Sequence, residues 1–396
     1  MTYIWKRVNT NSEHENEMPI ALIVACTAYH IDKFTWGQIR VLQKMGFEVH
    51  VAASFNVALS GNSSAAYVER CREKFVSEGI KVLELPFTRF PVSLKNFKAL
   101  RLLSKQLGKY SYRLMHCHTP TGGLFARIAA APRRKKGLSV VYTAHGFHFF
   151  RGAPLLNWLL YYPVEWCLAR ITDCLIVINS EDERIAHKLP VDFVARINGA
   201  GVSRESFDNS APINKADLGL LPEAFVFLCV GELSKRKNQE LLIRGFAAIA
   251  GQCPDAVLVL AGEGVMRVVY KQLADSLGLA QRVFFLGWRD DVPALVLMAD
   301  VIVSASKQEG LPVSLIEALV AGKPVIATPC RGNSDLAEQA GIIANGEKEF
   351  SEAMALIYKD EVLRAYFAQS AMASSYKYES RAVDGETEKL YLRVII

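Results

Sequence analysis

Two glutamates, Glu309 and Glu317, bracket a glycine turn in the sequence EGLPVSLIEALVAG. The apolar run before them, Val301 to Ser306, predicts a buried parallel strand, and the apolar spacing after Pro312 predicts a helix. A strand that leads through a glycine turn into a helix N-terminus favours an anion, because free N–H groups and the helix dipole point outward. Carboxylates on either side of a bound phosphate would suit a sugar nucleotide. An ordinary strand, loop and amphipathic helix with surface glutamates would give the same pattern.

A basic loop, GELSKRKN, begins at Gly231 and follows another predicted strand, Phe225 to Val230. Its three cations, Lys235, Arg236 and Lys237, stand just before a predicted helix, where they could clamp a diphosphate. A solvated basic loop is the ordinary alternative. The position directly after a strand end favours the binding role.

Two histidines, His118 and His145, end consecutive predicted strands and lead into glycine-containing turns. At the carboxyl ends of parallel strands they would face a ligand cleft, although satisfied structural histidines are the alternative. In the stretch His116-Cys117-His118 adjacent side chains point to opposite faces of a strand, and no second ligand cluster completes a tetrahedron. We therefore expect no metal and no cofactor.

Strands and helices alternate along the chain, and the strands are apolar on both faces, which predicts parallel sheets covered by helices. The first strand, Ile20 to Cys26, is followed by a polar loop from Thr27 to His30, and the pattern restarts after a hinge at Asn198 to Val202. With 396 residues, we expect two doubly wound, Rossmann-like α/β domains facing across a cleft. The predicted divisions are a polar arm at 1–18, a first domain at 19–199, a second at 200–378, and a C-terminal helix at 379–396 that packs back on the first domain.

Charge is distributed unevenly along the chain. Residues 1–200 carry 26 Lys plus Arg and 15 Asp plus Glu, a balance of +11, whereas residues 201–396 carry 20 and 25, a balance of −5. No acidic residue lies between Glu84 and Glu165, where thirteen cations fall. A one-sided basic region indicates an anionic partner. Leu94 to Tyr110 reads as a basic amphipathic helix, and an aromatic run at 158–166 would suit a membrane interface. No recognition motif supports nucleic acid, the rival partner.

The sequence shows neither a secretory signal nor a membrane-spanning segment. The polar stretch Met1 to Met18 does not resemble a secretory signal, and the apolar run Ala153 to Ala169 is interrupted by Asn157, Pro163 and Glu165. The eight cysteines are scattered, which favours reduced thiols. These features predict a cytoplasmic protein with peripheral contact to an anionic membrane through residues 89–151.

The motifs together resemble a known family. The spacing Glu309…Glu317 within EGLPVSLIEALVAGKPVIAT resembles the signature of retaining, family 4 glycosyltransferases of the GT-B fold. The segments HCHTPTGGLFARIAA, YTAHGFHFFRGAPLLNWLLYYPVEWCLAR, VGELSKRKN and FLGWRDD resemble the capsular and exopolysaccharide branch of that family. The resemblance runs from about Ile20 to Tyr378.

The resemblance implies roles for particular residues. Glu317 would hold the ribose hydroxyls, and Glu309 would lie beside the transferred sugar. Lys237 would bind the diphosphate, and His118 would lie near the sugar, with His145 at another cleft position. The amides around Gly310, Leu311 and Pro312 would lie by the diphosphate and sugar, and Phe285 to Trp288 would flank the base. Gly231 and Arg236 would also contact the donor.

One position departs from the family pattern, because Glu232 stands where an arginine is common. A glutamate does not neutralise phosphate, which leaves the charge to Lys237 and to Lys235 or Arg236. The sequence has no Asp-x-Asp, so we expect the helix dipole and lysine to stabilise the leaving group. The family implies retention by front-face displacement, in which the phosphate helps to take the acceptor proton.

The predicted function is transfer of a sugar from a nucleotide sugar, UDP-linked by expectation, to a polyprenyl-diphosphate-linked saccharide in capsular or exopolysaccharide biosynthesis. Two alternatives stay open at this point. One is a soluble glycosyltransferase that acts on a small sugar or glucan. The other is a non-catalytic sugar-nucleotide-binding subunit, which Glu232 makes conceivable.

Overall fold

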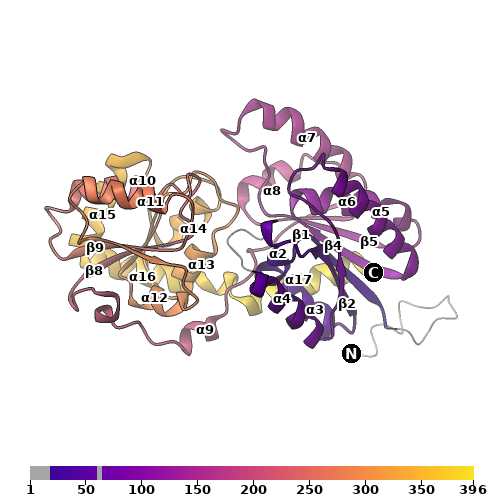
Figure 1. The fold of residues 1–396 in the computed structure, drawn as a ribbon, viewed down its shortest axis with the longest axis horizontal. Helices are drawn as coiled ribbons and strands as arrows, with labels where there is room; N and C mark the ends of the chain where they lie inside the picture. The colour runs from indigo at the N-terminus through magenta and orange to yellow at the C-terminus, as the bar shows by residue number, and fades with distance from the viewer. Residues whose placement is uncertain (1–17, 60–64) are drawn as a thin grey trace. The chain divides into compact units, whose positions relative to one another are not determined.

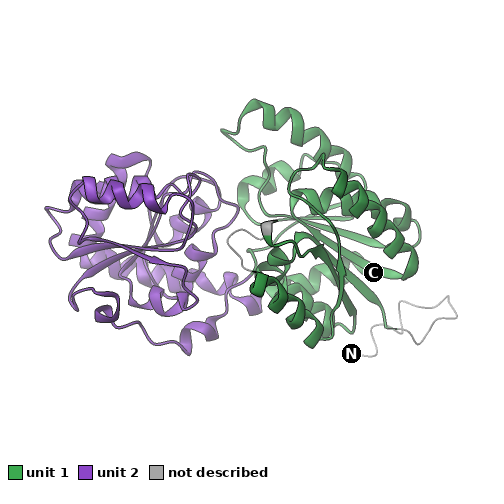
Figure 2. Ribbon diagram, in the orientation of Figure 1, with its two compact units in different colours: residues 1–200, 383–396 green, residues 201–382 purple. Residues whose placement is uncertain are grey.

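The computed structural model describes residues 18–59 and 65–396. The chain forms two compact units, residues 1–200 with 383–396 and residues 201–382 (Figure 2). The predicted arm at 1–18 lies, apart from Met18, outside the described residues. The cleft predicted between the domains stays a prediction.

Unit 1 is built on a parallel sheet with the strand order β3-β2-β1-β4-β5-β6-β7. Its strands are β1 (Ile20–Thr27), β2 (Glu48–Ser54), β3 (Lys81–Glu84), β4 (Tyr112–His118), β5 (Ser139–Ala144), β6 (Cys174–Val177) and β7 (Phe193–Arg196). The central strands are buried on both faces, as their continuous apolar sequences predict. The order reverses between β1 and β4, so the chain winds outward in both directions from that point.

Helices cover both faces of this sheet (Figure 1). One layer consists of α5 (Leu94–Lys109), α6 (Pro120–Arg134), α7 (Leu155–Ala169) and α8 (Ser180–Ala186). The other consists of α2 (Ala28–Phe34), α3 (Trp36–Lys44), α4 (Ala65–Ser77) and the C-terminal α17 (Ser380–Ile395), and a 3₁₀ turn spans Val57–Leu59. One prediction for this unit was wrong. The residues after the first strand form α2, not a loop, because Thr27 caps the helix by accepting a hydrogen bond from the His30 amide.

Unit 2 repeats the doubly wound plan with the strand order β10-β9-β8-β11-β12-β13. Its strands are β8 (Phe225–Val230), β9 (Ala256–Ala261), β10 (Val283–Gly287), β11 (Val301–Ser304), β12 (Val325–Ala327) and β13 (Gly341–Ile343). Its helices are α9 (Arg204–Asp208), α10 (Gln239–Ile249), α11 (Arg267–Ser276), α12 (Val292–Met298), α13 (Val313–Val320), α14 (Asn333–Ala340), α15 (Gly346–Lys359) and α16 (Glu361–Ser375). Short 3₁₀ turns span Lys215–Leu218 and Tyr376–Tyr378. All neighbouring strands are parallel, so the predicted α/β architecture is confirmed in both units.

The C-terminal helix α17 is tied to the centre of unit 1 by a buried hydrogen-bond chain. The Tyr391 hydroxyl lies 2.6 Å from His116 Nδ1, and the other ring nitrogen of His116 lies 2.7 Å from Thr143 Oγ1. Both ring nitrogens of His116 are therefore satisfied. This histidine has a structural role.

Removal of the Tyr391 hydroxyl should therefore loosen α17. We expect Tyr391→Phe to lower the free energy of unfolding by about 1–3 kcal/mol, because it leaves a buried nitrogen of His116 unpaired. Urea denaturation of the variant measures the loss. Tyr366→Phe, at an exposed tyrosine, is the matched control. Equal stability of the two variants would contradict the structural role of the bond.

No helix in residues 18–59 and 65–396 combines the length and apolarity required to cross a membrane.

Candidate functional site

The first candidate site lies where the strand order of unit 2 reverses. Strands β8 and β11 are neighbours there, and their carboxyl ends point to the same edge of the sheet. The basic loop follows β8, and the segment that contains Glu309 follows β11. A topological switch point of this kind is the usual ligand position in open parallel sheets.

Glu309 is held between two cations of the basic loop. Lys237 Nζ lies 2.6 Å from Glu309 Oε1, and Arg236 Nη1 lies 3.3 Å from Glu309 Oε2. Arg236 also donates a hydrogen bond to the Gln308 carbonyl oxygen at 3.1 Å. The Glu309 side chain is 9% exposed and that of Lys237 is 17% exposed, whereas Arg236 approaches from solvent with 47% of its side chain exposed. Two positively charged side chains thus converge on one buried anion.

The pKa of Glu309 reflects two opposed effects. Burial raises it, but the charges of Lys237 and Arg236 outweigh burial and lower the pKa below its ordinary value. Glu309 is therefore ionised at neutral pH. A diphosphate that entered this site would compete with Glu309 for the same two cations.

The glycine turn after Glu309 is fixed by close backbone contacts. Gly332 has φ 78°, and a side-chain carbon at this position would lie 2.2 Å from the Gly310 carbonyl oxygen. Arg331 is buried, and its Nε donates a hydrogen bond to the Glu309 carbonyl oxygen at 3.0 Å. The turn is consequently rigid, and only glycine fits at 332.

Helix α13 begins directly after this turn and has no side-chain cap at Pro312. Gly310, Leu311 and Pro312 thus lead into a helix N-terminus that lacks a side-chain cap, and the positive end of a helix favours an anion. Glu317 lies further along α13 and is partly buried. Burial raises the pKa of Glu317 to about 7, and no charged group among the described residues contributes to that shift.

Three other predicted positions lie around this edge. Gly231 follows β8 and lies close to the Lys237 side chain. A Cβ atom added at Gly231 would lie 3.4 Å from Lys237 Cε. Trp288 follows β10 and is exposed, with its indole N–H donating to Asp290 Oδ1 at 3.1 Å. Glu232 is exposed, and its carboxylate lies 4.0 Å from Arg236 Nη2. Glu232 therefore draws on the same arginine as Glu309.

The second candidate site lies at the switch point of unit 1. His118 ends β4, His145 follows β5, and His30 belongs to α2 after β1, so the three come from adjacent strands. His145 Nε2 lies 3.1 Å from His30 Nε2 and 3.1 Å from His118 Nδ1. His118 is fully buried, and its Nε2 has no hydrogen-bond partner among the described residues. His118 Nε2 is thus a buried polar atom whose hydrogen-bonding capacity is unused in the described part of the chain.

These three histidines are neutral at physiological pH. Burial lowers the pKa of His145 to about 4. Burial, reinforced by neighbouring histidines, lowers the pKa values of His30 and His118 well below the ordinary 6.5. The cluster therefore offers hydrogen-bond donors and lone pairs, not positive charge.

His118 is positioned by an unusual backbone conformation at the next residue. Thr119 has φ 63°, which a β-branched residue rarely adopts. Its hydroxyl accepts a hydrogen bond from the Cys26 amide at 3.0 Å and donates one to the His118 carbonyl oxygen. These bonds couple the ends of β1 and β4 and stabilise the strained turn.

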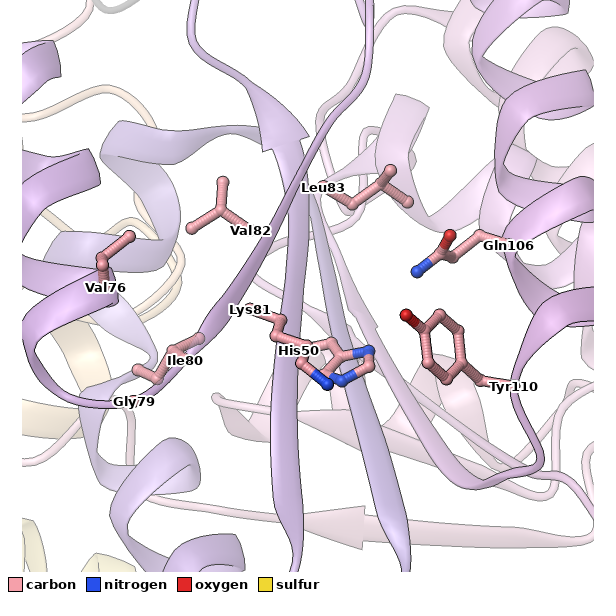
Figure 3. Close-up of a pocket in the computed structure, with 9 residues that line it drawn as sticks. All are labelled: His50, Val76, Gly79, Ile80, Lys81, Val82, Leu83, Gln106 and Tyr110. Carbon is pink, nitrogen blue, oxygen red and sulfur yellow. The ribbon is translucent and has the colours of Figure 1, made fainter.

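A hollow of about 500 Å³ lies elsewhere in unit 1, beside the edge strand β3 (Figure 3). His50 of β2 lines it, together with Gln106 and Tyr110 from the end of α5. Both ring nitrogens of His50 are paired, with the Tyr112 hydroxyl at 2.7 Å and Glu48 Oε1 at 3.0 Å. His50 therefore has a structural role, whereas His118 keeps one ring nitrogen without a partner among the described residues.

An exposed apolar surface lies on the helical layer formed by α5, α6 and α7. On α7, Leu155 and Leu156 are 74% and 61% exposed, and Leu159 and Leu160 are also exposed. Only part of the aromatic run at 158–166 that was predicted to suit a membrane interface is exposed. Trp166 and Tyr161 are exposed, whereas Trp158 and Tyr162 pack on Phe149. The predicted apolar face of α5 is divided as well. Leu103 and Leu107 are buried, but Leu94 and Phe97 in its first turns are exposed.

The structure brings some of the predicted site residues together within each unit. In unit 2 it places Glu309 against Lys237 and Arg236, and in unit 1 it places His118 against His145. Sequence reasoning missed His30, although this histidine also follows a strand end, as His118 and His145 do. Its position was obscured because β1 and β4 are neighbours only in space. The sequence also offered no further metal ligands near His118. In the structure, one ligand atom each of His30, His118 and His145 lie within 4.8 Å of one another.

The comparisons with known proteins agree with this architecture. Residues 31–196 match the family model described as "Glycosyl transferase 4-like domain", and residues 210–373 match "Glycosyl transferases group 1". The chain is 40% identical over 335 residues to the putative glycosyltransferase EpsD of Bacillus subtilis, covering 83% of this chain and 82% of that protein. It is 32% identical over 305 residues to the Escherichia coli UDP-Gal:alpha-D-GlcNAc-diphosphoundecaprenol alpha-1,3-galactosyltransferase, covering 73% and 78%.

A solved structure shows the same fold. Anabaena Alr3699/HepE in complex with UDP superimposes with a TM-score of 0.74 at 20% identity, covering 95% of this chain and all of that one. The two units are thus the two halves of a GT-B glycosyltransferase. The chain belongs to the family 4 glycosyltransferases, in the branch that contains EpsD, which confirms the resemblance inferred from its motifs.

Proposed function

We propose that this glycosyltransferase transfers a sugar from a UDP-sugar to a polyprenyl-diphosphate-linked saccharide in capsular or exopolysaccharide assembly, at the cytoplasmic face of the membrane. The observation that carries the donor site is the pairing of Glu309 with Lys237 and Arg236 beside the uncapped start of α13. The donor and acceptor are supported by the names of similar proteins, a UDP-galactose transferase that acts on a diphosphoundecaprenol lipid and a structure that contains UDP.

The proposed site divides the donor among three groups. The diphosphate accepts hydrogen bonds from Lys237 Nζ and from the amides after Gly310, which places its charge at the positive end of α13. The carboxylate of Glu317 accepts hydrogen bonds from the ribose hydroxyls. Glu309, released from its cations by the diphosphate, accepts hydrogen bonds from the transferred sugar. Trp288 stacks beside the base.

Transfer breaks the bond between the anomeric carbon and the diphosphate oxygen, and forms a bond from that carbon to an acceptor hydroxyl on the same face. The acceptor proton passes to the departing diphosphate, so UDP leaves and the configuration is retained. Lys237 and the helix dipole stabilise the charge that develops on the leaving group, without a metal at the diphosphate. His118 lies on the acceptor unit and donates or accepts one hydrogen bond through its free Nε2.

The test of this function is a thermal-shift panel of nucleotide sugars on the intact chain. A UDP-sugar at a hundred times its Kd stabilises the folded form by about 2.7 kcal/mol and raises the Tm. We expect UDP-sugars to shift the Tm and GDP-sugars to leave it unchanged. A panel in which no nucleotide sugar raises the Tm would overturn the donor site.

Binding of a UDP-sugar should depend on pH through Glu317. The pKa of the free carboxyl is about 7, and hydrogen bonds from ribose hydroxyls favour its ionised form. Affinity should therefore weaken by about tenfold for each pH unit below 7, and level off above it. Calorimetric titration measures this slope, since the UDP-sugar itself has no group that titrates near neutral pH. Glu317→Gln should abolish the slope, and a slope that survives in the variant would contradict the assignment.

The lipid-linked acceptor fits the exposed helical layer of unit 1. Leu156 and Leu160 of α7 project from this layer, and the first turns of α5 add Leu94 and Phe97. Lys95, Lys98 and Arg101 are exposed on the same helix α5, and no acidic residue interrupts this part of the sequence. Apolar side chains flanked by cations suit an anionic bilayer surface.

The membrane contact makes its own prediction. The double variant Leu156→Glu/Leu160→Glu should lower partition onto vesicles of anionic phospholipid by at least about tenfold, because two apolar contacts are lost and charge repulsion is added. Vesicle sedimentation measures the partition. Val268→Glu, at an exposed valine of α11, is the control. Equal partition of both variants would argue against this surface.

A further inference from the structure

We propose that His30, His118 and His145 form a binding site for a divalent ion of the zinc class, with the fourth coordination position open. The site belongs to unit 1 alone and is independent of the donor-binding residues. Three imidazoles and an exchangeable fourth ligand are a recurrent arrangement for zinc in proteins.

The distances within the cluster are close to those of a metal site. A metal–nitrogen bond of about 2.0–2.1 Å in a tetrahedral site places two ligand nitrogens about 3.3–3.4 Å apart. In this chain His145 Nε2 lies 3.1 Å from His30 Nε2 and 3.1 Å from His118 Nδ1, and all three ligand atoms lie within 4.8 Å of one another. Small ring rotations would bring the three nitrogens to equal separations.

Hydrogen bonding alone satisfies this arrangement poorly. A neutral imidazole has one N–H and one lone pair, each directed along a single line in the ring plane. His145 Nε2 faces two other ring nitrogens, so one lone pair or one N–H is shared between two contacts. A cation at the centre would accept one lone pair from each ring.

The three ligands are held by rigid elements. His118 ends the central strand β4 and is fixed by the hydrogen bonds of Thr119. The His30 amide donates a hydrogen bond to the capping Thr27, and His145 directly follows β5. Ligands from three adjacent strand ends preorganise a metal site better than loop residues do.

The expected affinity is moderate. Metal-binding histidines normally donate their other N–H to a carboxylate or carbonyl group, and loss of such support costs about 10–100-fold in affinity. His118 Nε2 has no such partner within the described part of the chain. The cluster contains three protein ligands among these residues, so water or a substrate oxygen would complete the coordination.

Cobalt(II) binding by the full-length, metal-free protein tests this inference. A tetrahedral cobalt site gives an intense visible absorption band, which we expect to saturate at one ion per chain and to disappear on addition of zinc. His145→Asn and His30→Asn should each abolish the band. His187→Asn, at an exposed histidine, should leave it unchanged. Circular dichroism of each variant establishes that the fold is retained.

Two results would overturn the site. One is the absence of a saturable visible band, and the other is a band that survives in a folded His145→Asn variant or carries the sulfur charge-transfer absorption of cysteine ligands. Cobalt binding needs no nucleotide sugar. A chain that binds UDP-sugars but no cobalt therefore defeats only the metal site, and the reverse outcome defeats only the proposed function.

Discussion

Lys237→Ala is expected to lower kcat for sugar transfer by on the order of 10²–10³-fold. Lys237 Nζ lies 2.6 Å from Glu309 Oε1 and beside the start of α13, where the proposed diphosphate gains charge as the sugar departs. Since Glu232 stands where the family resemblance leads us to expect an arginine, little other positive charge compensates for the loss. Arg236, the second cation beside Glu309, also donates a hydrogen bond to the Gln308 carbonyl oxygen, so only part of its hydrogen-bonding capacity is left for the diphosphate.

The same variant should change the pH dependence of activity. Without Lys237, the charge of Arg236 and the hydrogen bond of Ser306 remain to oppose the effect of burial, so the pKa of Glu309 should rise. The acidic limb of the kcat/KM profile, which reports ionisations of the free enzyme, should therefore move toward higher pH. Lys271→Ala, at an exposed lysine of α11, is the matched control for kcat and for the pH profile. Full activity of Lys237→Ala would refute the proposed clamp, whereas a loss without the pH shift would refute its coupling to Glu309.

Much of the fold could be predicted because its signals are local. Apolar runs such as Val301 to Ser304 and the helical spacing after Pro312 depend on neighbours in sequence, and both elements occur as expected. The C-terminal helix was also predicted and forms as α17. The helix after β1 was missed, because its start depends on a capping bond from Thr27 that no apolar pattern reveals.

The candidate sites were less accessible to sequence reasoning, since they depend on which strands become neighbours. The family resemblance gave Lys237 a role at the diphosphate and Glu309 a role at the transferred sugar. Their ion pair was not predicted, and it follows from the adjacency of β8 and β11. His30 was missed because the adjacency of β1 and β4 brings it to His118 across 88 positions of sequence. The raised pKa of Glu317 depends on burial, which spacing does not measure.

A buried ion pair between α6 and α7 is another feature that could not be predicted from the sequence. In the sequence, Glu165 only interrupts an apolar run. In the structure it is buried against Arg127 of α6, with Arg127 Nη2 donating to Glu165 Oε2 at 3.1 Å. Arg127 also donates from Nε to the Gly123 carbonyl oxygen at 3.0 Å, and its guanidinium lies 3.9 Å from the centre of the Tyr142 ring. The pair attaches α7, and with it the exposed apolar surface, to the body of unit 1.

Glu165→Ala should therefore destabilise the protein by about 3–5 kcal/mol, because it leaves the charge of Arg127 buried and unpaired. The Tm of unit 1 should fall by on the order of 10 °C. Glu223→Ala, at an exposed glutamate, should change stability by less than about 0.5 kcal/mol.

The double variant Arg127→Met/Glu165→Leu separates charge from packing. It removes both charges and keeps apolar volume, so it should recover most of the lost stability. Recovery would show that the cost in Glu165→Ala comes from the buried, unpaired charge of Arg127. A double variant as unstable as Glu165→Ala would instead show that the two side chains act through shape, and would remove the electrostatic argument for this contact.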